Sequence, residues 1–101
     1  SIIFAGLSTS NGCYMSLLSN NGQTIDKLSI ANGYTINNLD EDNGNLALSA
    51  GHDGVLIYKY YGGLNVEFIG QLNTPYSNNV KVDGNNLIVS TEDGIYIYLI
   101  K

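Results

Sequence analysis

The chain alternates short apolar runs with short polar runs along its whole length. The apolar runs are about four to eight residues long and rich in Ile, Val, Leu and Tyr, which is typical of β-strands. Asn-Gly, Asp-Gly or Gly-Asn pairs separate many of them and favour tight hairpins, because these residue types tolerate a positive φ. No segment keeps a 3.6-residue period long enough for a helix. The pattern predicts strands near residues 2–7, 13–18, 24–30, 34–39, 45–50, 55–60, 65–72, 78–82, 86–91 and 95–100.

The pattern also repeats with a period of about 40 residues. The pairs that match at this offset are Gly44-Asn45 with Gly84-Asn85, Asp53-Gly54 with Asp93-Gly94, and Ile57-Tyr58 with Ile97-Tyr98. A diverged copy opens the chain, where Ile2 to Gly6 corresponds to Leu46 to Ala50 and Cys13 corresponds to Val55. Repeats of this length, each built from short strands, are typical of β-propeller blades.

We therefore expect an all-β fold of antiparallel, four-stranded β-propeller blades, with three blade cores that form an incomplete ring. Residues 1–101 make one propeller segment: a partial first blade at 1–31, a second at 32–73, and a third at 74–101 that lacks its outer strand. Because propellers close with four to eight blades, further blades should complete the ring. They would come from the same polypeptide or from another copy in a homo-oligomer.

Alternation along the third strand of each repeat predicts which side chains are buried. The residues expected at equivalent buried positions are Cys13, Val55 and Ile95, followed two residues later by Met15, Ile57 and Ile97.

Charge and the length of the apolar runs argue against two kinds of partner, nucleic acid and the membrane interior. The net charge is −5 and the chain has only four Lys and Arg residues, whereas nucleic-acid binding depends on clustered cations. No apolar run approaches the roughly 20 residues that a membrane-spanning helix needs. We therefore expect no nucleic-acid partner and no membrane span.

The second and third repeats resemble the LVIVD repeat family of bacterial surface and secreted β-propellers. The matching segments are GNLALSAGHDGVLIYKY at 44–60, VEFIGQLNTPYSNNVKV at 66–82 and GNNLIVSTEDGIYIYLI at 84–100. They include a V-x-x-I-G strand at 66–70 and the dipeptide Thr74-Pro75. This resemblance implies a non-enzymatic ring in an extracytoplasmic location, at the cell surface, in the periplasm or secreted. It supplies no ligand.

Three candidate reactive sites have simpler structural interpretations. Asp40 to Asp42 form an acidic cluster, but its spacing lacks a calcium-loop frame, so we expect a solvated hairpin tip. His52 is the only histidine, too few ligands for a metal site, so we expect a turn residue. Cys13 occupies a strand position without a nearby base, so we expect a buried apolar side chain. No catalytic residue, metal or cofactor is expected.

Tyr34 and Tyr76 lie near loops at the starts of the inner strands, with Asn38 and Asn79 close behind them in the sequence. These four residues are the candidates for a ligand-binding face. The leading hypothesis is a non-catalytic propeller module that offers a binding or structural surface to a protein or glycan. The alternatives are a fragment of a propeller enzyme of the glycoside hydrolase type, with a carboxylate pair at the ring axis, and a carbohydrate-binding lectin.

Overall fold

The computed structural model describes residues 2–6 and 10–101, and this part of the chain contains ten β-strands and no helix. The strands are β1 (Ile2–Gly6), β2 (Cys13–Leu18), β3 (Thr24–Ile30), β4 (Asn38–Asp42), β5 (Asn45–Ser49), β6 (Val55–Tyr60), β7 (Val66–Leu72), β8 (Ser77–Asp83), β9 (Asn86–Thr91) and β10 (Gly94–Leu99). The expected all-β fold is confirmed. Among the described residues there is no helix of the length and apolarity that would cross a membrane.

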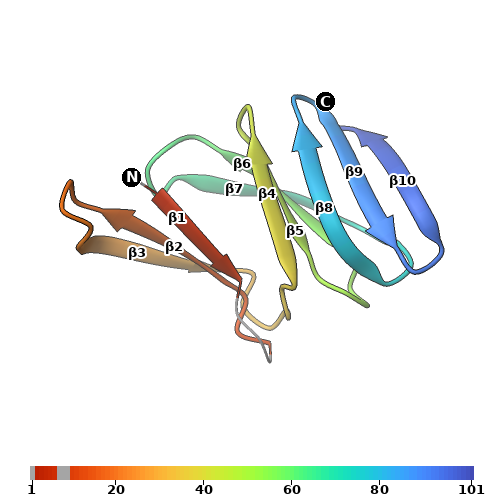
Figure 1. The fold of residues 1–101 in the computed structure, drawn as a ribbon, viewed down its shortest axis with the longest axis horizontal. Helices are drawn as coiled ribbons and strands as arrows, with labels where there is room; N and C mark the ends of the chain where they lie inside the picture. Colours follow the sequence, from red (N-terminus) through yellow and green to blue (C-terminus); the bar gives the residue numbers. More distant parts are fainter. Residues whose placement is uncertain (1, 7–9) are drawn as a thin grey trace.

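The strands form three antiparallel sheets, each made from one continuous stretch of chain. The first sheet has the order β1-β2-β3, the second β4-β5-β6-β7, and the third β10-β9-β8. Within each sheet, every strand pairs with its neighbour in sequence, as expected when short turns join consecutive strands. The sheets follow one another in chain order across the molecule (Figure 1).

Nine strands begin and end within one residue of their predicted bounds; residue 7, at the end of the first predicted strand, lies outside the described residues. The exception is the strand expected at 34–39, because β4 runs from Asn38 to Asp42. Its apolar pattern suggested an earlier start, but residues 34–37 are irregular. The acidic residues that follow are part of the strand because they pair with β5.

The second sheet lies between the other two, and its central strands β5 and β6 are largely buried on both faces, whereas β7 is mostly exposed. Every residue of β5 is buried. One face packs on the first sheet. In this cluster, Leu46, Leu48 and Leu56 of the second sheet lie with Cys13 and Met15 of the first sheet. The other face packs on the third sheet in a separate cluster, whose members are Ala47, Val55, Ile57, Val80, Val82, Leu87 and Val89. The described residues therefore form two hydrophobic cores, one at each junction between sheets.

The predicted burial of the third strands is confirmed for two repeats and wrong for the last one. Cys13, Met15, Val55 and Ile57 are buried, whereas Ile95 and Ile97 are each 70% exposed. The third sheet covers Val55 and Ile57, and no described sheet covers the corresponding face of β10. Alternation places Ile95 and Ile97 on one face of β10, but burial of that face also requires a neighbouring sheet.

Pairing also shows how the repeats correspond in space. Asp42 pairs with Asn45 and Asp83 with Asn86, so the turn Asn43-Gly44 corresponds to Gly84-Asn85, an offset of 41 residues. The sequence match at 40 holds for β6 and β10 but not for this hairpin. The difference lies in the next turn, which has five residues between the paired Ser49 and Val55 but four between their counterparts, Ser90 and Ile95.

Candidate functional site

Three segments meet at one end of the junction between the second and third sheets: the approach to β4, the turn between β5 and β6, and the start of β8. The Ser77 N–H donates to the Gly51 carbonyl at 3.0 Å, and the Asn37 amide donates to the Ser77 carbonyl at 2.9 Å. The buried hydroxyls of Ser49 and Ser77 lie 2.6 Å apart in a hydrogen bond. These bonds fix the three segments relative to one another.

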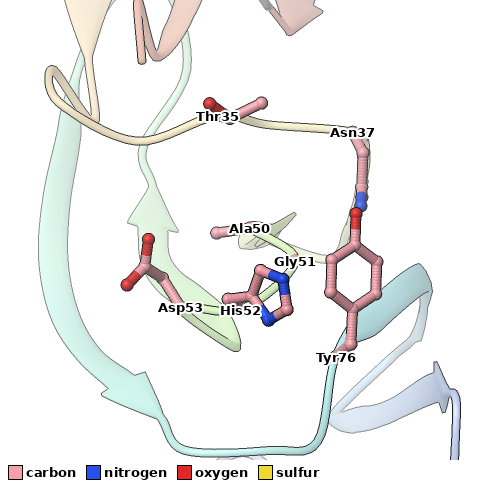
Figure 2. A pocket seen from close by; sticks show the side chains of 7 residues that line it. All are labelled: Thr35, Asn37, Ala50, Gly51, His52, Asp53 and Tyr76. Carbon is pink, nitrogen blue, oxygen red and sulfur yellow. The ribbon is translucent and has the colours of Figure 1, made fainter. Parts of the chain in front are cut away.

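A cavity of about 300 Å³ opens beside this meeting point (Figure 2). The residues that line it are Thr35, Asn37, Ala50, Gly51, His52, Asp53 and Tyr76. Its wall therefore combines one aromatic ring, an imidazole, a hydroxyl, an amide and a carboxylate. Such a mixture of an apolar surface and a few polar groups is typical of sites for small polar ligands.

The two rings of the cavity wall are held together. The imidazole of His52 meets the Tyr76 ring edge to face, with centroids 4.7 Å apart and an interplanar angle of 82°. The turn can pass under the Tyr76 ring because residue 51 is glycine. A Cβ at Gly51 would lie 3.0 Å from that ring, and the φ of +58° there also favours glycine.

The four predicted ligand-face residues are dispersed by the fold. Tyr76 lines the cavity. Tyr34 is partly buried against the first core, and the Asn38 side chain accepts a hydrogen bond from the Val80 N–H at 2.9 Å. Asn79 is exposed on β8. Only Tyr76 therefore belongs to the cavity.

Sequence reasoning missed the other wall residues of the cavity. His52 lies in a turn, as expected, but this turn packs its imidazole against a tyrosine 24 positions later in the chain. Asn37 and Thr35 lie in an irregular segment that was expected to be a strand. The proximity of these residues depends on how two sheets stack, which no local pattern records.

The acidic cluster does not form the expected solvated hairpin tip. Asp40 and Asp42 lie within β4, and their carboxylates accept hydrogen bonds at 2.8 Å from the N–H groups of Val82 and Gly84 respectively. Both β4 and β8 are edge strands of their sheets. Side chains of β4 therefore accept hydrogen bonds from backbone N–H groups that the β8 edge leaves without a strand partner. We call these three acceptors, Asn38, Asp40 and Asp42, the β4 ladder. In the described part of the chain, no group of three or more His, Cys, Asp or Glu residues is arranged to hold a metal ion.

Cys13 is fully buried, as expected. Burial raises the pKa of its thiol from 9.0 to about 11. Since the thiolate is the reactive form, this side chain is protonated and unreactive near neutral pH. It acts as a small apolar residue of the first core.

Comparison with known proteins adds no relative, since no family model, curated protein or solved structure matches this chain. The cavity can bind a small molecule through ring contacts and hydrogen bonds. The sheets can present a rigid surface.

Proposed function

We propose that this chain is a segment of a β-propeller that serves an extracytoplasmic protein as a non-catalytic binding surface. The cavity beside Tyr76 is its ligand site, and the ligand is a neutral saccharide. The resemblance to LVIVD repeats supports both the propeller and the extracytoplasmic location. The observation that carries the binding role is the cavity of about 300 Å³ with its mixed aromatic and polar wall.

The arrangement of the sheets supports a propeller. Three sheets follow one another in chain order, and a hydrophobic core lies between each neighbouring pair. Blades are arranged in this way around a ring. The second sheet has the four antiparallel strands of a complete blade. In the ring we propose, further blades continue this order on either side.

The engagement of the acidic cluster at Asp40 to Asp42 supports a non-catalytic role, and Asp53 is the one carboxylate among the residues that line the cavity. A glycoside hydrolase needs two carboxylates free to face the substrate. Asp40 and Asp42 instead accept backbone hydrogen bonds from β8 and the turn after it, and Glu41 accepts one from the Gly44 N–H at 3.1 Å. These three side chains are used to hold the structure together.

The chemistry of the cavity wall favours a saccharide among small ligands. A sugar ring presents C–H groups on one face, which pack on an aromatic ring such as Tyr76, and hydroxyls around its edge. Asn37 and Asp53 carry amide and carboxylate groups at the same cavity, and both can accept hydrogen bonds from hydroxyls. The net charge of −5 disfavours an anionic ligand.

Titration with a panel of neutral mono- and disaccharides tests this proposal, with binding followed through NMR signals of Tyr76 and His52. We expect at least one sugar to shift these signals in a saturable way, and Tyr76→Ala to abolish the shift of the His52 signals. Tyr61→Ala is the control, because Tyr61 is exposed in a different loop and its loss should leave binding intact. If no saccharide shifts the cavity signals up to its solubility limit, the assignment of the ligand is wrong.

A further inference from the structure

On the outer face of the third sheet, one strand, β10, carries three exposed large apolar side chains. Ile95 and Ile97 are 70% exposed and Leu99 is 62% exposed. Ile97 pairs with the half-buried Ile88 of β9, so these four side chains share one face. Contiguous exposed apolar surface of this kind marks an interaction site.

The chain itself shows what covers such a face. In the second sheet the equivalent positions are Ala47, Val55 and Ile57, and the third sheet buries them. In the first sheet they are Phe4, Cys13 and Met15, and these pack in one cluster with residues of the second sheet. At both junctions, therefore, the next sheet of the repeat covers this face.

The opposite end of the molecule carries the other half of the same interface. In the second sheet, the positions that face the preceding sheet are Leu46, Leu48 and Leu56. Their counterparts on the first sheet are Ile3, Ala5 and Tyr14, because the strand pairing matches Leu46 with Ile3 and not with Ile2, as the sequence repeat had suggested. All three are exposed on the face turned away from the second sheet, Ile3 at 51% and Tyr14 at 37%.

Two of the three polar groups at the edge repeat in the same way, whereas the counterpart of Asp40 is Lys81. The positions on β8 that correspond to Asn38 and Asp42 of the β4 ladder are Asn79 and Asp83, at an offset of 41 residues, and both are exposed. The β4 ladder binds the backbone of an edge strand and the turn after it. Asn79 and Asp83 therefore lie at the edge of the open face with the spacing of Asn38 and Asp42, whereas β1, the edge strand of the first sheet, is the counterpart of β5 and not of β8.

We propose that the outer face of the third sheet binds the outer face of the first sheet of a second copy of this chain, head to tail. The two open faces are the two halves of an interface that the chain already forms twice internally. The association is heterologous, because each copy contributes a different surface, and it continues into a ring or a chain of copies.

Sedimentation equilibrium of two variants, each with one of the two faces blocked by a lysine, tests this proposal. Ile97→Lys blocks the third-sheet face and Ile3→Lys blocks the first-sheet face. We expect the unmodified chain to associate with rising concentration, and each variant alone to remain a 10.9 kDa monomer. An equimolar mixture of the two variants should form a dimer and stop there, because each variant keeps the face that the other has lost.

Tyr61→Lys, which adds the same charge in a loop between β6 and β7, is the control and should associate like the unmodified chain. Circular dichroism checks that each variant stays folded, as expected for substitutions of exposed residues. A monomeric unmodified chain at all concentrations would overturn the proposal, and so would an Ile3→Lys variant that dimerises alone through paired third sheets. The measurement needs no saccharide, so its failure leaves the ligand proposal standing.

Discussion

At the level of single residues, a turn glycine can be required by a contact with a later strand as well as by the conformation of the turn itself. Gly54 has a φ of +76°, and a Cβ there would lie 2.0 Å from the Leu72 carbonyl oxygen of β7. The turn between β5 and β6 therefore needs glycine for two reasons, one local and one tertiary. Only the local reason is visible in an Asp-Gly pair.

Substitution of Gly54 separates these two reasons. Gly54→Ala should lower the free energy of unfolding by more than about 3 kcal/mol, because the Leu72 carbonyl must move in addition to the positive-φ penalty of roughly 1–2 kcal/mol. Gly22→Ala is the matched control, since its φ is +84° and a Cβ there would meet no atom within 4 Å; it should lose the φ penalty alone. Urea denaturation of both variants measures the difference, and equal losses would show that the Leu72 contact is unimportant.

The buried thiol of Cys13 should make stability depend on pH. Its pKa is raised by burial to about 11 in the fold and is near 9.0 when the group is exposed, so the unfolded chain loses this proton first. The stabilising contribution is therefore complete below pH 9 and is lost as pH rises toward 11. Unfolding of the unmodified chain and of Cys13→Val, compared from pH 8 to pH 11, should show their stability difference moving in favour of Cys13→Val. A difference that does not change with pH would contradict the burial of the thiol.

At the level of the strand, most of the fold was predictable because each strand is bounded by its own turn residues. The strand β4 was misplaced because its sequence, NLDED, is polar, and polar residues are poor signals for a strand. Its aspartate side chains accept hydrogen bonds across the junction between sheets, from N–H groups of β8 and of the turn after it. The cavity was unpredictable for the same reason: His52 and Tyr76 are brought together only by the stacking of sheets.

The β4 ladder should contribute measurably to stability. Asp40→Ala removes the acceptor of the Val82 N–H and should cost about 1.5–3 kcal/mol, as for other hydrogen bonds to charged groups. Asp40→Asn keeps an acceptor and should cost less. Glu92→Ala, in an exposed turn, is the control for loss of an acidic side chain. Amide hydrogen exchange at Val82 should accelerate in Asp40→Ala relative to the global unfolding rate, whereas unchanged exchange there would show that the ladder is dispensable.

At the level of the whole molecule, the main feature is that three sheets stack in series and form two separate cores. The repeat in the sequence predicted the strands and their order, but the sequence alone did not show which end would be left uncovered. That depends on how many sheets follow one another, and this is why Ile95 and Ile97 were expected to be buried and are exposed. The same hairpins could otherwise have closed into one two-layered sandwich around a single core.

Methyl–methyl nuclear Overhauser effects between the core side chains test this stacking. We expect the Met15 methyl group to contact methyl groups of Leu46 and Leu48, and Val89 to contact those of Ala47 and Ile57, as members of their respective cores. We expect no contact between Met15 and Val89, because the second sheet lies between them. A cross-peak that joins Met15 directly to Val89 would show a single shared core and would contradict the stacked arrangement.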